Sequence, residues 1–311
     1  MAFFYVVLVV VFIQKSPLSI IKLAKQKNPL LGNILGLVLV VFFFTLAYIY
    51  LYDFQSFMSI HLPRTPPVLV GLILVLLCSY VVKLGLEVMA GLAAILIPFA
   101  LFLVAAGIIL NFFTIDIAFI PPVLPLENWG GIIKGTMLQM ANYGELLVLT
   151  MLLPEAKRPG SSLKPVLIPV AVIGLLIVLL TFSLYGTFGS YANNIVFKLF
   201  GLYRKTGPFE SVFIFLWVST FLIKISLFYY AVVRGLSEVL ELEGYKLLVM
   251  PVAVLISFTT LISFDGYIDY NNFLVSSFML FELFIVLVAP LLLVLALLLG
   301  SRKGERGLIK P

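Results

Sequence analysis

Long apolar runs recur along the whole chain, and they constrain its fold more than any other feature. We place them at residues 1–13, 30–52, 67–82, 88–110, 131–153, 166–186, 211–233, 247–264 and 278–299. A helix needs roughly 20 apolar residues to cross a hydrocarbon core about 30 Å thick, and most of these runs reach or approach that length. Only 11% of the 311 residues are charged, which is too few for the surface of a soluble protein. The sequence therefore predicts an all-α polytopic membrane protein.

The first of these nine runs, MAFFYVVLVVVFI at residues 1–13, is the shortest. At about 1.5 Å per residue it would reach only about 20 Å, which is less than the thickness of a membrane core. It also lacks the positively charged start and the cleavage site of a signal peptide. We therefore expect it to be the second half of a helix whose beginning is absent.

Lysine and arginine are distributed unequally between the two sides of the predicted spans. If the first run ends in the cytoplasm, fourteen of these residues fall inside and five outside, with Lys224 within a span. This bias predicts that the N-terminus is outside and that the basic tail, 300–311, is cytoplasmic. The loop 187–210 carries three of the five outward cations, two of them in its LYRK stretch, and we expect it to form a separate extracellular feature.

Motifs of catalysis and metal binding are absent from the sequence. There is no aqueous domain, no HExxH or GxSxG motif, and no pair of aspartates in facing spans. Cys78 and His61 are the only residues of their types, which excludes an internal disulfide and makes a metal site unexpected. We expect no enzyme activity, no cofactor and no nucleic-acid partner, and we expect membrane lipid around the chain.

Two ionisable residues lie deep within apolar runs, where each costs several kcal/mol unless it is paired or hydrated. Glu145 follows the start of 131–153 by 14 residues, and Lys224 follows the start of 211–233 by 13. Both runs are expected to cross from outside to inside, so both residues lie roughly 20 Å from the outer face. We predict that they face a common cavity, directly paired or bridged by water. Separate or purely architectural roles for the two charges stay open.

The residues around Glu145 predict an interrupted helix. Gly144 gives the backbone conformational freedom, and Asn142 can replace a lost backbone partner. Interrupted membrane helices expose backbone groups that hold polar solutes in transporters. A continuous helix packed closely around Gly144 is the alternative. With Tyr229, about one and a half turns after Lys224, the predicted solute-binding residues are Asn142, Tyr143, Gly144, Glu145, Lys224 and Tyr229.

Other charged positions near the spans have ordinary interpretations. Lys83 and Glu87 are four residues apart, and we expect them to form a local pair on one helix. Glu210 and Glu282 lie near the predicted outer ends of their spans, where we expect them to be hydrated.

Residues 209–254 resemble the endospore germination permease family, in the stretch FESVFIFLWVSTFLIKISLFYYAVVRGLSEVLELEGYKLLVMPVAV. The stretches SYVVKLGLEVMAGLAAILIPFAL, LENWGGIIKGTMLQ and ANYGELLVLTMLLPEAKRP are similar to the same family, in the same order along the chain. These proteins are the B subunits of nutrient germinant receptors and relatives of the amino acid–polyamine–organocation transporters. No short motif is diagnostic, so the resemblance rests on the ordered set.

The resemblance implies a bundle of two inverted repeats of five helices. On this chain it implies one transmembrane domain, 1–311, with an incomplete first repeat in 1–110 that lacks its first helix and a second repeat in 131–299. In transporters of this architecture the first helix of each repeat is broken and holds the solute. Here that helix would be 131–153.

The function implied is that of a germination receptor subunit in the bacterial cell or spore inner membrane. It would bind a small nutrient, with an amino acid as the first expectation, and signal to A-type and C-type subunits. Two alternatives stay open. One is a proton-coupled amino-acid transporter, and the other is a truncated scaffold without a binding site, or a chain whose start is misassigned.

Overall fold

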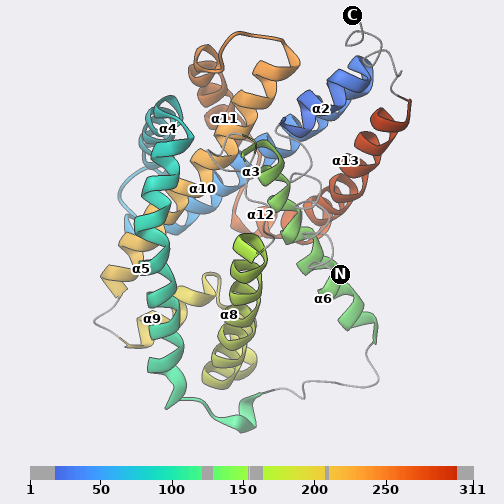
Figure 1. Ribbon diagram of the computed structural model, residues 1–311. Coiled ribbons are helices and arrows are strands. Elements are labelled where there is room, and N and C mark those ends of the chain that lie inside the picture. The colour runs from blue at the N-terminus through green and yellow to red at the C-terminus, as the bar shows by residue number, and fades with distance from the viewer. Residues whose placement is uncertain (1–17, 121–128, 153, 155–163, 207–209, 300–311) are drawn as a thin grey trace, which may run out of the picture. The chain divides into compact units, whose positions relative to one another are not determined.

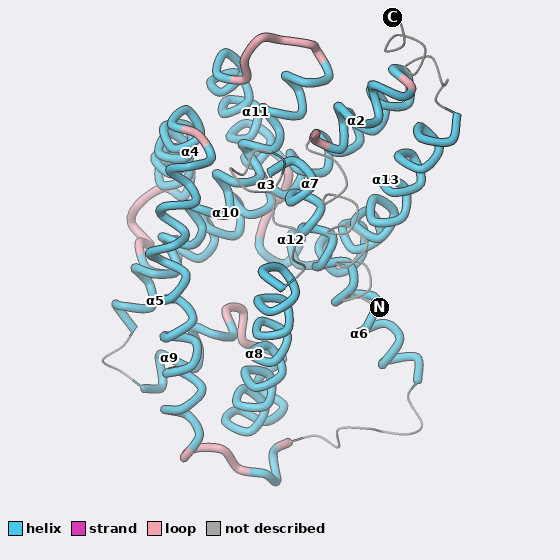
Figure 2. Tube along the Cα trace, in the orientation of Figure 1, coloured by secondary structure: helices cyan, strands magenta, loops and turns pink. Residues whose placement is uncertain are grey.

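The computed structural model describes residues 18–120, 129–152, 154, 164–206 and 210–299. Every element among these residues is a helix, and none of them forms a strand (Figure 1, Figure 2). The predicted run 1–13 and the predicted tail 300–311 lie outside the described residues.

Six helical stretches are long and apolar enough to cross a membrane. They are α3 (Pro29–His61), α4 (Pro67–Leu84), α5 (Leu86–Phe112), α8 (Lys164–Phe188) with η4 (Gly189–Asn194), α10 (Glu210–Val239), and the continuous helix formed by α12 (Tyr267–Phe273), η6 (Leu274–Phe278) and α13 (Met279–Leu299). Each corresponds to one of the predicted runs. The prediction of an all-helical, polytopic membrane protein is confirmed, whereas the inverted repeats stay a prediction.

The remaining helices are shorter. Two predicted spans, 131–153 and 247–264, correspond to shorter apolar helices at Tyr143–Leu152 and Lys246–Ile262. The first of these spans contains α6 (Trp129–Asn142), η2 (Tyr143–Val148) and α7 (Leu149–Leu152), and the second contains η5 (Lys246–Leu248) and α11 (Val249–Ile262). The other short helices are α2 (Ile20–Lys27), η1 (Ile117–Phe119) and α9 (Lys198–Thr206).

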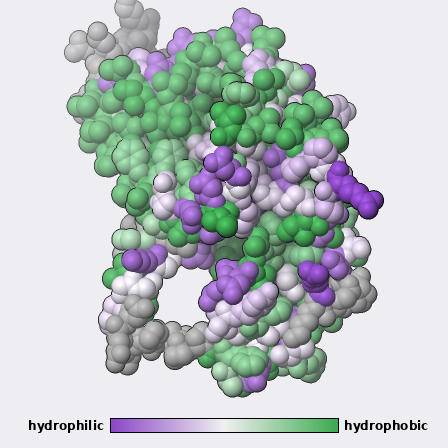
Figure 3. Space-filling model, turned by 180° about the vertical axis from the view of Figure 1, so that it is seen from behind, coloured by the Kyte–Doolittle hydropathy of each residue, from purple (hydrophilic) through white to green (hydrophobic). Residues whose placement is uncertain are grey.

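Large apolar side chains cover much of the surface of these helices. On α5, Phe99, Phe102 and Ile109 are all more than half exposed. Figure 3 shows hydrophobic residues in green over broad areas of the face in view. Contiguous exposed apolar surface of this extent marks contact with a membrane or a partner. Together with six helices of spanning length, it identifies the chain as an integral membrane protein.

The chain divides into two compact units, each assembled from separate stretches of sequence. Unit 1 comprises Met1–Ala47, Met137–Leu163 and Phe228–Pro311, and unit 2 comprises Tyr48–Thr136 and Lys164–Leu227. Helices α3 and α10 therefore contribute residues to both units.

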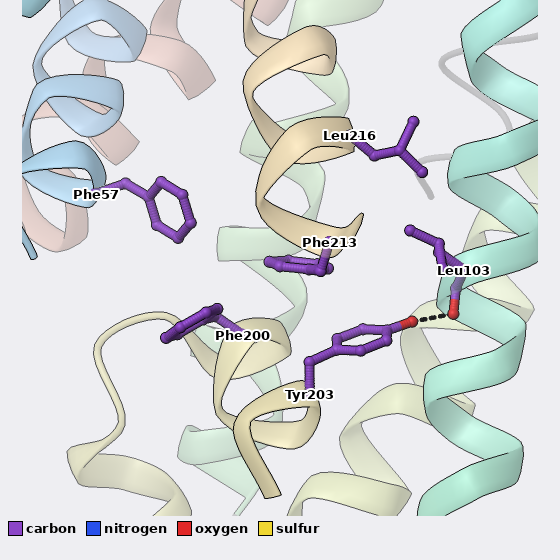
Figure 4. Packing of buried hydrophobic residues seen from close by; sticks show 6 residues of the cluster. All are labelled: Phe57, Leu103, Phe200, Tyr203, Phe213 and Leu216. Atoms are coloured by element: carbon purple, nitrogen blue, oxygen red, sulfur yellow. Dashed lines mark hydrogen bonds between the residues drawn. The ribbon is translucent and has the colours of Figure 1, made fainter. Parts of the chain in front are cut away.

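Unit 2 is held together by packing of α5 against α8 and α9 (Figure 1). An aromatic cluster fills its interior, formed by Phe57, Leu103, Phe200, Tyr203, Phe213 and Leu216 (Figure 4). The Tyr203 hydroxyl donates to the Leu103 carbonyl and accepts from the Gly107 N–H at 3.1 Å, which ties α9 to α5. The predicted extracellular loop 187–210 is thus helical over much of its described part in unit 2, which contains η4 and α9.

Gly85 separates α4 from α5. Its φ of 97° lies in the left-handed region, which glycine adopts without the steric cost that a Cβ brings. Lys83 lies in the last turn of α4 and Glu87 in the first turn of α5. The prediction that both residues lie on one helix is therefore wrong, because Gly85 separates α4 from α5, whereas their pairing stays a prediction.

In unit 1, the short helix α2 uses one apolar face for packing. Ile20, Ile21 and Ala24 are buried, and α2 packs against α13 and α7. Ser19 caps the helix, since its Oγ accepts a hydrogen bond from the Lys22 N–H at 3.2 Å. This arrangement turns the lysines of α2 away from the apolar interior.

Candidate functional site

Lys224 lies at the middle of α10, in the part of that helix that belongs to unit 2. Its Nζ lies 3.6 Å from the centroid of the Tyr50 ring on α3, a cation–π contact. Asp53 follows Tyr50 by three residues on the same face of α3, and its carboxylate interacts electrostatically with the Lys224 ammonium. All three side chains are partly buried. We call Tyr50, Asp53 and Lys224 the Lys224 group.

A pair of opposite charges inside a membrane span is weak evidence for a stabilising role. Desolvation of the two charges offsets much of their attraction, and apolar replacements of buried pairs are often neutral or stabilising. Ionisable residues within spans therefore mark functional sites by default. The Lys224 group is the position in unit 2 to which this argument applies most directly.

Asp53 lies outside the predicted spans, because the predicted run ends at Tyr52. The observed α3 continues to His61, a helix of 33 residues. Phe54, Phe57 and Met58 recur at helical spacing after the predicted end. That periodicity is the signal that would have extended the helix and brought Asp53 within it.

In unit 1, the helix type changes at the position predicted for an interruption. The α-helix α6 ends at Asn142, and η2 runs as a 3₁₀ helix from Tyr143 to Val148. Asn142 and Leu149, the residues that flank η2, both keep right-handed helical torsions. The helix therefore changes type here but continues without a break, so an opened helix that exposes backbone groups stays a prediction. Such 3₁₀ stretches within a helix often mark hinges or strained sites.

Gly144 allows η2 to pack closely on α13. A Cβ at Gly144 would lie only 2.8 Å from Cγ2 of Val286, so a side chain there would force the helices to shift. The Asn142 side-chain nitrogen donates to Oε1 of Gln139 at 3.0 Å, where we expected it to serve a backbone group. Tyr143 and Glu145 are partly buried, and Asn142 is exposed.

Two further side chains of unit 1 are deeply buried. The Tyr229 hydroxyl donates to the Val249 carbonyl on α11. Glu282 is 2% exposed, one turn before Val286 on the same face of α13. The prediction that Glu282 is hydrated near the end of its span is wrong. The helix that contains it begins at Tyr267, so Glu282 lies well within the helix and not at its start.

The predicted binding residues are divided between the two units. Four of them lie together around the junction of α6 and η2 in unit 1: Asn142, Tyr143, Gly144 and Glu145. Tyr229 lies elsewhere in unit 1, on α10, whereas Lys224 belongs to unit 2. A cavity shared by Glu145, Tyr229 and Lys224 stays a prediction.

A second charged cluster lies in unit 1, where α2 meets the C-terminal end of α10. Glu238 is 8% exposed and accepts a hydrogen bond from Ser19 Oγ at 2.5 Å. Its Oε1 lies 3.7 Å from Lys22 Nζ and 3.7 Å from Arg234 Nε. Lys25 Nζ lies 2.8 Å from Glu241 Oε1 and donates to the Glu238 carbonyl at 3.0 Å. We call this set the Glu238 group: Ser19, Lys22, Lys25, Arg234, Glu238 and Glu241.

Cys78 and His61 both pack against neighbouring residues of unit 2. Cys78 is buried, with Sγ 3.7 Å from the Leu222 carbonyl oxygen. The His61 ring centroid lies 4.7 Å from that of Phe57 and 4.8 Å from that of Phe200. Within the described ranges, no three His, Cys, Asp or Glu side chains are grouped in a way that could hold a metal ion.

Comparison with known proteins identifies relatives of this chain. The family profile described as "Spore germination protein" matches residues 1–265. The chain is 26% identical over 140 residues to spore germination protein XB of Bacillus anthracis, an alignment that covers 45% of this chain and 38% of that protein. The matched region thus spans well under two thirds of that relative. No solved structure matches the chain significantly.

Proposed function

Because the chain belongs to the spore germination protein family, we propose that it is the permease-like subunit of a nutrient germinant receptor. In this proposal it binds a small nutrient, most simply an amino acid, at the Lys224 group. The observation that carries the proposal is the position of Lys224 at the middle of a membrane helix, 3.6 Å from the centroid of the Tyr50 ring and in electrostatic interaction with the Asp53 carboxylate.

A zwitterionic amino acid has the two charges that this group can receive. Its carboxylate can bind the Lys224 ammonium, and its own ammonium can bind the Asp53 carboxylate or the face of Tyr50. Each protein charge then exchanges one opposite charge for another. This exchange avoids the high cost of leaving a single charge buried without compensation.

Nutrient binding can act as a signal only if two conformations of the subunit bind the nutrient with different affinities. Replacing the internal Asp53–Lys224 interaction with ligand contacts provides such a difference, because the two helices that carry these residues then lose a direct attraction. Germinant receptor subunits of the A and C types would respond to the shift. The 3₁₀ segment η2 and the π-helical segment η6 are the elements of unit 1 most suited to rearrange.

Spore germination tests the proposal directly. The chain would replace the B-type subunit in a strain that lacks its own, and germination would be measured after addition of single amino acids, sugars or nucleosides. We expect Lys224→Met to raise the nutrient concentration for half-maximal germination at least about tenfold, the effect of losing one charged contact. Lys224→Arg, which keeps the charge, should retain part of the response.

Lys83→Met is the matched control, since Lys83 is an exposed lysine of the same unit outside the Lys224 group. Immunoblots of spore membranes would show that all variants accumulate equally. An unchanged response of Lys224→Met spores at equal protein level would overturn the proposed site. Saturable, proton-driven uptake of labelled amino acids into vesicles containing only this chain would instead support the transporter.

A further inference from the structure

The chain from the end of α8 to α9 lines an open pocket on unit 2. The pocket has a volume of about 410 Å³, and Ile60 from the end of α3 adds to its lining. Small-molecule sites in proteins have volumes from about 300 to 1,000 Å³ and mostly apolar walls with a few polar groups. This pocket therefore has the size for a small metabolite.

The apolar wall of the pocket is held in place by the aromatic cluster behind it. Phe200, which lines the pocket, packs edge-on against Phe57 at a centroid distance of 5.7 Å (Figure 4). Phe197, another lining residue, packs edge-on against the same Phe57 ring at 5.1 Å. Because these rings already have fixed neighbours, binding would require little ordering of the wall.

Arg204 determines the charge of the pocket. It is the one charged side chain among the described lining residues, and Asn194 adds an amide. A guanidinium group matches the planar geometry of a carboxylate with two parallel donors. Glu210 on α10 is not a lining residue, but it acts electrostatically on the His61 ring with a sign opposite to that of Arg204.

We infer that the pocket between η4 and α9 binds a small apolar carboxylate, with its hydrophobic part against Phe197 and Phe200 and its carboxylate at Arg204. This site is distinct from the Lys224 group and does not require the proposed germination function. Either could fail without the other, because the pocket is tested by binding and the Lys224 group by spore response.

Binding can be measured on the full chain in lipid nanodiscs through the fluorescence of Trp217. The Trp217 ring lies 5.9 Å from Phe57 and 5.3 Å from Phe213, next to the pocket wall. Trp129 would be replaced by Phe so that Trp217 alone reports. The probes are phenylacetate, phenylacetamide and phenethylamine, which share a ring and differ in charge. We expect saturable binding, tightest for phenylacetate and weakest for phenethylamine.

Substitution of Arg204 tests the carboxylate contact. Arg204→Gln should weaken phenylacetate binding about two- to fivefold, the scale of an exposed ion pair, and remove its advantage over phenylacetamide. Lys198→Gln, at an exposed lysine of the same helix outside the pocket, should leave both affinities unchanged. Glu210→Gln should strengthen phenylacetate binding, because it removes the opposing charge.

Substitution of Val196 tests the location. Val196→Phe should fill the mouth of the pocket and weaken all three probes, whereas Val212→Phe, on the exposed face of α10, should not. Thermal unfolding would confirm that the variants remain folded. Unchanged phenylacetate binding in both Arg204→Gln and Val196→Phe would overturn the inference, as would loss of binding in Lys224→Met alone, which would assign the probe to the Lys224 group.

Discussion

The Lys224 group and the Glu238 group both hold charges away from water, but they differ in how those charges are supported. Glu238 has a serine hydroxyl, a lysine and an arginine within 3.7 Å, contributed by α2 and its flank and by α10 itself. The contacts described for Lys224 are an aromatic face and one carboxylate, both from α3. A carboxylate with several partners near a helix end is well suited to fasten two helices. A charge pair at the middle of a span is better suited to exchange with a ligand.

Glu241 strengthens the structural interpretation of the Glu238 group. Its φ of 55° lies in the left-handed region, which costs a residue with a Cβ about 1 kcal/mol or more. The Leu242 N–H bonds to the Ser237 carbonyl at 2.9 Å, so this turn closes the end of α10. Glycine or asparagine is usual at such a position. Glu241 occupies it with its carboxylate on Lys25, which links the helix end to α2.

Replacing Asp53 should change the free energy of unfolding more than any other substitution described below. A small change would contradict the contrast between the Lys224 group and the Glu238 group. Asp53→Asn removes the interaction of the Asp53 carboxylate with the partly buried Lys224 ammonium. We expect the free energy of unfolding to fall by about 3–5 kcal/mol, the cost of breaking a buried pair. The double variant Asp53→Asn/Lys224→Met should regain most of that loss in thermal unfolding in detergent. A double variant no more stable than Asp53→Asn would show that the two charges are not coupled.

Removing the charge of Glu238 should have the next largest effect. Glu238→Gln weakens its interactions with Ser19, Lys22 and Arg234 together, and we expect a loss of about 2 kcal/mol, as for hydrogen bonds to a charged group. Glu243→Gln, at an exposed carboxylate nearby, should change stability by less than about 0.5 kcal/mol. Germination response should be retained in proportion to folded protein. A specific loss of nutrient response in Glu238→Gln would remove the distinction between the two groups.

The Tyr50 ring should make a smaller contribution. Tyr50→Leu removes the aromatic face under the Lys224 ammonium, and we expect a loss of about 1 kcal/mol beyond that of Tyr50→Phe, which keeps the cation–π contact. Chemical denaturation of the two variants gives the difference. Equal stabilities for Leu and Phe at this position would mean that Lys224 gains nothing from the ring.

The Lys25–Glu241 contact should give the smallest effect, visible only in acid. The hydrogen bond from Lys25, and then its charge, lower the pKa of Glu241 from its ordinary value of 4.5. A carboxyl whose pKa is lower in the folded state stabilises the fold above its unfolded pKa, and this stabilisation is lost as the pH falls below about 4.5. The melting-temperature difference between the native chain and Lys25→Gln should therefore shrink between pH 6 and about pH 3. A difference independent of pH would exclude Glu241 as its source.

Several site residues could be predicted from the sequence, because their roles depend on the residue itself and on its immediate neighbours along the chain. Asn142 and Gly144, whose preferences act on their own backbone, marked the segment that departs from the α-helix, although they predicted a break and not the 3₁₀ helix observed. Lys224 stands out because any charge within an apolar run needs compensation, whatever the fold. Asp53 could not be identified in the same way, because the composition of the chain changes at Tyr52 while the helix continues to His61.

The sequence by itself determined that this chain is a set of membrane helices, because the solvent imposes length and apolarity on each helix independently of its neighbours. It also marked the positions of Lys224 and Gly144. Only the tertiary structure decided which side chains meet: Tyr50 and Asp53 at Lys224, Val286 at Gly144, and the partners that surround Glu238. Depth along a helix can be counted from residue numbers, but the face that a residue turns to its neighbour is fixed by how the helices pack.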